Sequence, residues 1–155
     1  MTPMSPLQLK RHCFTTIVLK AVERGSADAP ALLSPDIRFE RNPEAANQWR
    51  LSLSLKVRSG DDKKPFAYEA EVKVQGLVEV SDKFPEEKRE QLAAINGFSI
   101  LFSAAREMLL NLTARSLHGP LTLPTLNFTA LVDSHRKRAQ QAPVPPKTTQ
   151  PASAQ

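Results

Sequence analysis

The sequence predicts an α+β fold in which antiparallel strands come first and a long helix covers them. Three observations support this prediction. Residues 48 to 58 alternate strictly between apolar and polar side chains, residues 66 to 80 alternate again, and a dense apolar helix follows within residues 98 to 116. At 155 residues the chain has the length of a single domain and can bury a substantial core.

The two alternating segments each have one apolar and one polar face, as half-buried strands do. Because the turn-forming residues SGDDKKP separate them, we expect a long antiparallel hairpin with one face in water. Residues 7 to 20 form an earlier strand whose alternation changes phase near Cys13 and Phe14, which indicates a bulge or bend. Residues 23 to 35 are expected to be a crossover loop, and residues 36 to 41 a short fourth strand.

Two helices are expected after the strands, with a break between them. Pro85 and the two glutamates after it suit the first turn of a short helix, which Asn96-Gly97 is expected to end. The main helix then spans about residues 98 to 116. Its sheet-facing stripe should comprise Phe98, Leu101, Ala104, Ala105, Met108, Leu109 and Leu112.

Three further apolar residues of the main helix fall outside this stripe. They are Ile100, Leu110 and Leu117. One sheet cannot bury both sides of a helix, so this helix needs a second partner. A copy of the same chain is the simplest candidate, and we predict that these three residues form an oligomer interface.

The segment that follows the main helix, GPLTLPTLNF (residues 119 to 128), is as apolar as the helix itself. Its two prolines, Pro120 and Pro124, exclude a helix and stiffen the backbone. Two interpretations are open: the segment folds back onto its own core, or it forms an exposed apolar ledge that marks a binding site. Residues 129 to 138, TALVDSHRKR, are expected to form a C-terminal helix.

Charge and composition limit the classes of function. The net charge of +5 arises mainly at the end of the chain, because residues 1 to 133 contain 17 basic and 16 acidic residues. The basic residues after this point are Arg136, Lys137, Arg138 and Lys147. They make nucleic-acid binding an alternative, although a weak one, because no aromatic platform for bases accompanies them. Residues 142 to 155, rich in Pro, Gln, Ser and Ala, are predicted to be a disordered tail, and residues 1 to 141 the folded domain.

Motifs of catalysis, cofactor binding or metal binding are missing. The chain has no Gly-rich phosphate loop, CxxC or HExxH, and its histidines at positions 12, 118 and 135 are widely separated. Asp133, Ser134 and His135 are triad residue types but are consecutive. We therefore predict a protein that is not an enzyme and takes no cofactor. The N-terminus lacks the features of a signal peptide, no continuous apolar stretch is long enough to span a membrane, and Cys13 is the single cysteine, so we predict a cytoplasmic protein.

The main helix contains the run ILFSAARE (residues 100 to 107), and the segment GPLTLPTLNF follows the helix. These two segments resemble the SecB family of bacterial export chaperones. The first is similar to a Leu-Phe-Pro-Tyr-Ala-Arg-Glu type motif, and the second to a family loop of the form Pro-x-Leu-x-Leu-x-Pro-x-Asn-Phe. Gln75-Gly76-Leu77-Val78 resembles the family's Gly-Ile-Phe segment. The resemblance covers about residues 7 to 135. The chain departs from it at Ser103 and Ala104, which replace Pro and Tyr, and in its basic end, which is acidic in family members.

The resemblance implies a four-stranded antiparallel sheet backed by the long helix and assembled as a dimer of dimers, a homotetramer. It implies an ATP-independent holdase that binds unfolded, apolar segments of client proteins or preproteins and keeps them competent for export. The client-binding residues would be Leu121, Leu123, Pro124, Leu126 and Phe128. The motor SecA is a possible partner, which the basic end of the chain disfavours. The alternative is a SecB-like chaperone of a toxin-antitoxin system, whose client is an antitoxin.

Overall fold

The computed structural model describes residues 2 to 142 and contains one sheet and two helices. Four strands come first: β1 (Leu7–Ala21), β2 (Ala31–Arg41), β3 (Gln48–Ser59) and β4 (Tyr68–Val80). The helices α1 (Glu86–Thr113) and α2 (Phe128–Gln141) follow. The strands are antiparallel in the order β1-β4-β3-β2. This arrangement confirms the α+β class and the four-stranded sheet.

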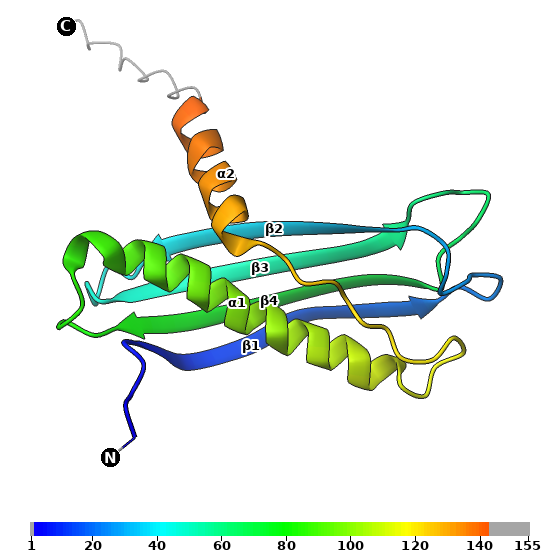
Figure 1. Ribbon diagram of the computed structural model, residues 1–155, viewed down its shortest axis with the longest axis horizontal. Helices are drawn as coiled ribbons and strands as arrows, with labels where there is room; N and C mark the ends of the chain where they lie inside the picture. Colours follow the sequence, from blue (N-terminus) through cyan, green and yellow to red (C-terminus); the bar gives the residue numbers. More distant parts are fainter. Residues whose placement is uncertain (1, 143–155) are drawn as a thin grey trace, which may run out of the picture.

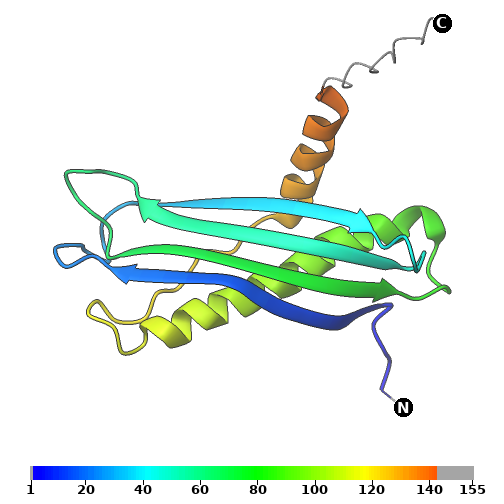
Figure 2. The same ribbon diagram turned by 180° about the vertical axis from the view of Figure 1, so that it is seen from behind.

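The molecule has two layers (Figure 1). The long helix α1 lies across one face of the sheet, and the segment after it runs back over the same face before α2 extends outward near β2. Seen from behind, the other face of the sheet is covered by none of the described segments (Figure 2). We call the first face the helix face and the second the outer face.

Register explains why the core forms on the helix face. Leu51, Leu53 and Leu55 of β3 lie opposite Gly76, Val74 and Val72 of β4, and the two leucine-valine pairs are almost completely buried. Because paired residues of an antiparallel sheet point to the same side, the alternation of each strand places one apolar row under α1. The predicted hairpin of residues 48 to 58 with residues 66 to 80 is therefore confirmed.

The two edge strands, β1 and β2, contain a bulge and a proline, respectively. In β1 the register shifts between Leu9 and Arg11 and again between Phe14 and Thr16, which confirms the bulge expected near Cys13 and Phe14. The expected short strand of residues 36 to 41 was too short, because β2 begins at Ala31. Pro35 does not prevent this extension, since proline is tolerated where a strand forms the edge of a sheet.

The expected helix break at Asn96-Gly97 is wrong, because α1 continues through it. Gly97 is buried there, and a Cβ atom on it would lie 2.3 Å from Cδ1 of Leu51. The glycine therefore allows close approach of α1 to β3 instead of ending the helix. A similar contact occurs at Gly76, where a Cβ atom would lie 2.8 Å from Cδ2 of Leu101.

Continuity of the helix also corrects the expected stripe. The buried residues of α1 are Ala93, Ala94, Gly97, Phe98, Leu101, Phe102, Ala105, Leu109 and Thr113. Phe102 was missed although it lies four residues after Phe98, which is the spacing of one helix face. Leu112, expected to face the sheet, is 45% exposed.

By length and composition, α1 would also be long and apolar enough to cross a membrane. A single helix of this kind is weak evidence, because the core helix of a globular domain passes the same test. Its buried residues pack against the sheet, and we interpret it as a core helix.

Gly97→Ala is expected to destabilise the fold by about 1 kcal/mol. Alanine in a helix normally gains about 0.5 to 1 kcal/mol over glycine, but overpacking a core costs about 1 to 3 kcal/mol. Urea unfolding at fixed protein concentration measures the difference. The exposed neighbour offers the control, since Asn96→Ala should be neutral or stabilising, and a stabilised Gly97→Ala would contradict the close packing of α1 on β3.

Candidate functional site

The segment between α1 and α2, residues 114 to 127, is held in place by hydrogen bonds at His118, Gly119 and Leu121. The hydroxyl of Thr113, fully buried, accepts a bond from the backbone N–H of Leu121 at 2.7 Å and donates one to the carbonyl of Leu109 at 2.6 Å. The hydroxyl of Tyr68 donates to the carbonyl of Gly119, and Nε2 of His118 bonds to the carbonyl of Val22 at 2.6 Å. The first half of this segment is thus fixed to the sheet and to the end of α1.

The chain reverses direction at Gly119, whose φ is +75°. Only glycine adopts this left-handed conformation without strain, so the residue suits a tight reversal after the helix. After it the backbone is extended, and its side chains alternate like those of a strand. Leu121 and Leu123 are buried, whereas Thr122 and Pro124 are exposed.

This alternation decides between the two interpretations of the apolar segment for most of its residues. Leu121, Leu123 and Phe128 are 7%, 4% and 5% exposed and belong to the core of their own chain. The expectation that they form an exposed ledge is therefore wrong in this single chain. The reason is that each has a polar or proline neighbour that takes the outward position. Of the predicted client-binding residues, Pro124 is exposed and Leu126 is partly buried.

Phe128 has a clear structural role. It is the first residue of α2 and stacks on Phe98, with ring centroids 6.3 Å apart. The ring centroid of Phe102 lies 5.6 Å from that of Phe128. Asn127 before it caps the helix, because its side chain accepts a bond from the N–H of Ala130 at 3.1 Å. The aromatic ring therefore fastens the start of α2 to α1.

Next to this segment, a small groove opens between α1 and residues 122 to 123. We call it the helix-loop groove. Its volume is about 280 Å³, and it is lined by Ser103, Arg106, Glu107, Leu110, Thr122 and Leu123. The groove brings together Leu123 from the predicted client-binding set and Leu110 from the predicted interface set. Sequence spacing alone could not show this, because the groove depends on how residues 114 to 127 fold back.

The outward side of α1 and the loop just after it expose further apolar side chains. Ile100, Leu110 and Leu117 are 38%, 39% and 67% exposed. Ile100 and Leu110 lie away from the core, as the helix wheel predicted. Leu117 lies in the turn after α1, because the helix ends at Thr113 and not near residue 116 as expected. Their role in assembly stays a prediction.

Candidate chemical groups are not gathered into a reactive site in the part of the chain that the structure describes. His118 contacts Val22 and Tyr68, and His135 packs on Phe39 with centroids 5.4 Å apart. No group of three potential metal-ligating side chains occurs within residues 2 to 142. The absence of enzymatic activity stays a prediction.

The alternative of nucleic-acid binding relied on the basic end of the chain. Arg136 pairs with Glu90 at 3.1 Å, so it stabilises the packing of α2 on α1. Lys147 and the predicted disordered tail lie outside the described residues, apart from Ala142. Among the described residues, the basic end of the chain therefore adds nothing that favours this alternative.

Truncation of the buried loop leucine should cost stability. Leu123→Ala is expected to lower the free energy of unfolding by about 2 to 5 kcal/mol, as for other buried leucines. Pro124→Ala, at the exposed neighbouring position, should change it by about 0.5 kcal/mol or less. Chemical unfolding of both variants tests the placement, and equal effects would show that Leu123 is not part of the core.

Comparisons with known proteins agree with this architecture. Residues 15 to 140 match the family model SecB, described as preprotein translocase subunit SecB. Two relatives named protein-export protein SecB, from two strains of Acidithiobacillus ferrooxidans, are each 31% identical over 97 residues. These alignments cover 63% of this chain and span 62% of the length of the relatives.

A solved structure shows the same fold at lower identity. It contains the Mycobacterium tuberculosis Rv1957 SecB-like chaperone in complex with a ChAD peptide from the Rv1956 HigA1 antitoxin. It superposes with a TM-score of 0.59 at 19% identity and covers 78% of this chain and 91% of that chain. Together with the family match over most of the sequence, these findings show that the chain belongs to the SecB family.

Proposed function

We propose that this protein is an ATP-independent chaperone that holds unfolded, apolar segments of client proteins and keeps them competent for export. The observation that carries the proposal is the helix-loop groove in a member of the SecB family, with exposed apolar side chains on the adjoining side of α1. Apolar surface that a folded chain leaves in contact with water is typical of a binding site.

The dimensions of the groove suit single side chains of an extended client. At about 280 Å³ it lies just below the usual range of roughly 300 to 1,000 Å³ for small-molecule pockets. Its apolar contact comes mainly from Leu110, which is 39% exposed, because Leu123 is only 4% exposed. Its rim carries both charges, on Arg106 and Glu107. A rim of this kind selects for apolarity and tolerates either sign of charge in the flanking client residues.

Affinity at one groove should be low, which a holdase needs in order to release its client. Burying one apolar side chain contributes about 1.5 to 3 kcal/mol, while association and ordering of the chain cost several kcal/mol. Several grooves on one assembly raise the effective concentration for a long chain. Long unfolded proteins would therefore bind much more tightly than short peptides.

The exposed apolar side chains on α1 and in the turn after it support such an assembly. We propose that Ile100, Leu110 and Leu117 form the interface between copies, in a dimer and then a dimer of dimers. Because Leu110 also lines the helix-loop groove, a neighbouring copy would border the groove. Pro124 and Leu126 are the remaining predicted client-binding residues that a client could reach from outside.

An antitoxin-binding chaperone is the second candidate. The likeness to the Rv1957 SecB-like chaperone favours it, since that protein was solved with a peptide from an antitoxin. Isolation of the complexes formed in cells separates the two candidates: exported precursors among the bound proteins support the first, and one antitoxin as the predominant bound protein supports the second.

Thr122→Trp tests the groove directly, because this exposed residue lines it. An indole ring there should fill the groove and weaken suppression of client aggregation about tenfold, a change of about 1.4 kcal/mol. Light scattering during dilution of a denatured client, without nucleotide, measures the effect.

Thr125→Trp gives the matched control, since Thr125 is exposed in the same segment but does not line the groove. Equal activity of the two variants would exclude the groove as the client site. Aggregation suppression that requires ATP would exclude the holdase mechanism.

Leu110→Lys tests assembly. A lysine in an apolar interface must be buried or must separate the copies, so the variant should sediment as a smaller species than the unchanged protein at micromolar concentration. Lys88→Ala, near the exposed start of α1, should not change the sedimentation. A single-chain species for the unchanged protein would remove the proposed interface.

A further inference from the structure

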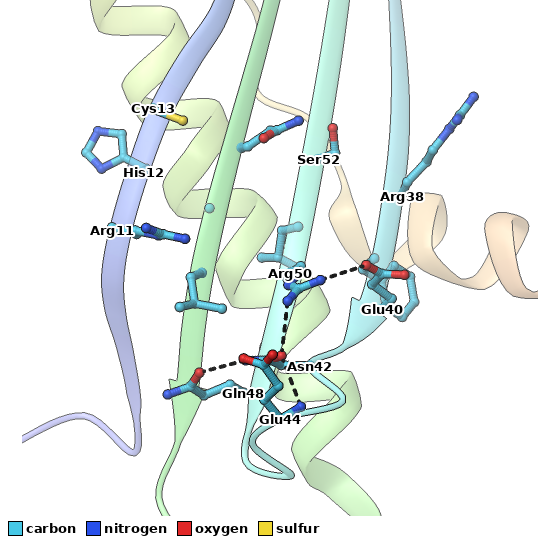
Figure 3. A pocket seen from close by; sticks show the side chains of 15 residues that line it. Arg11, His12, Cys13, Arg38, Glu40, Asn42, Glu44, Gln48, Arg50 and Ser52 are labelled. Atoms are coloured by element: carbon cyan, nitrogen blue, oxygen red, sulfur yellow. Dashed lines mark hydrogen bonds and ion pairs between the residues drawn. The ribbon is translucent and has the colours of Figure 1, made fainter.

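The outer face of the sheet contains a hollow that the proposed client site does not use. The hollow has a volume of about 900 Å³ and takes side chains from all four strands, among them Arg11, Arg38, Arg50 and Gln75 (Figure 3). A second hollow of about 480 Å³ continues from it and shares Arg38 and Ser52. We call the two together the outer trough.

The shape of the outer trough follows from side-chain size. Along β3, Ser52 and Ser54 provide a low floor with hydroxyl groups that donate and accept hydrogen bonds. Longer side chains on either side form the walls, with Arg38 on β2 and Lys73 on β4. The trough is thus about as wide as the spacing across three strands, roughly 10 Å, which suits an extended polypeptide.

The charge of the outer trough is predominantly positive. Five cationic side chains line it: Arg11, Arg38, Arg50, Lys56 and Lys73. Three carboxylates line it as well: Asp36, Glu40 and Glu44. Within residues 2 to 142, Arg11 and Lys56 form no ion pair with a carboxylate. Arg38 pairs with Asp36 at 3.7 Å, and Lys73 pairs with Glu71 at 3.3 Å.

One end of the trough is held in place by a network of polar contacts (Figure 3). Arg50 contacts Glu40 at 3.7 Å and Asn42 at 3.3 Å, and the side chain of Asn42 donates to Gln48 at 3.0 Å. Gln48 in turn donates to Glu79 at 2.9 Å, and this hydrogen bond lowers the pKa of the Glu79 carboxyl. The guanidinium of Arg50 is therefore oriented before any ligand binds, which reduces the ordering cost of binding.

We propose that the outer trough binds an extended acidic segment of a partner protein. Its cations would pair with the Asp or Glu side chains of the segment, and the hydroxyls of Ser52 and Ser54 would accept or donate further hydrogen bonds. The three carboxylates of the trough argue for a peptide and against nucleic acid. They repel a continuous phosphate backbone, whereas a peptide can place neutral or basic residues opposite them.

This site is independent of the proposed client groove, because the two lie on opposite faces of the sheet (Figures 1 and 2). A client can therefore occupy the helix face while the acidic partner occupies the outer face. Recognition of the partner rests on charge, and recognition of the client on apolar surface, so salt should weaken the first much more than the second.

The test uses the full chain and a labelled eight-residue peptide of alternating Glu and Ser, with a Lys-Ser peptide of equal length for comparison. The Glu-Ser peptide should bind more tightly, and raising the salt from about 50 mM to 500 mM should weaken it several-fold. The double variant Lys56→Glu, Lys73→Glu reverses the charge of two cations that line the trough. It should weaken binding of the Glu-Ser peptide about tenfold or more.

The control variant carries Lys63→Glu with Lys64→Glu, in the exposed loop between β3 and β4, and has the same net charge. It should keep at least half of the affinity, and an equal loss in the two variants would reduce the effect to net charge and overturn the proposal. Tighter binding of the Lys-Ser peptide, or of a single-stranded oligonucleotide that responds to the same variants, would also overturn it.

Folding and client holding provide the remaining checks on the same proteins. The Lys56→Glu, Lys73→Glu variant loses the ion pair of Lys73 with Glu71 and places a glutamate opposite Glu71, so it should unfold at a slightly lower temperature. It should suppress aggregation as well as the unchanged protein. If it does not fold, Arg11→Glu at the exposed end of the trough replaces it and should weaken the peptide about threefold. Unchanged peptide affinity in a folded variant would refute the site.

Discussion

The structure depends on the close approach of α1 to the sheet at two glycines. Leu51 of β3 fits against Gly97 of α1, and Leu101 of α1 fits against Gly76 of β4, so each surface supplies one large residue and one gap. Packed in this way, α1 buries Phe98, Leu101, Ala105 and Leu109 in one stripe. Interdigitation fixes the rotation of the helix about its axis, and this rotation decides which of its residues face outward.

The rotation of α1 about its axis also determines where the helix-loop groove lies. With the glycine side of α1 against the sheet, Leu110 and its exposed apolar neighbours point away from it, and Thr113 lies buried at the end of the helix. The buried hydroxyl of Thr113 then binds the N–H of Leu121, which sets the phase of the following alternation. Leu121 and Leu123 turn inward, Thr122 turns outward, and the helix-loop groove lies between them and α1.

Much of this could be predicted from the sequence, and the failures have physical causes. The strict alternation of apolar and polar residues predicted β3 and β4, because a sheet with one face in water requires this pattern. The outward side of α1 was also clear from helical spacing. Gly97 was misinterpreted, because a glycine that ends a helix and a glycine that packs against a leucine look the same without the partner strand. The prediction for the extended segment was wrong for the same reason. Whether its leucines or its threonines face inward depends on the hydrogen bond between Thr113 and Leu121, which no local sequence pattern shows.

The asymmetry of the sheet has a functional consequence. On the helix face, nearly all apolar side chains of the sheet are buried in the core. Only the outward surface of α1 and of the extended segment is therefore left for a client. The outer face carries mostly polar side chains from β3 and β4, and it can carry charge without loss of core packing. Arg50, Lys56 and Lys73 can therefore change among related proteins while the fold stays the same, since none contributes to the apolar core. If the two proposed sites are correct, partner choice on the outer face can vary independently of client binding, because exposed charges set specificity at little cost in stability.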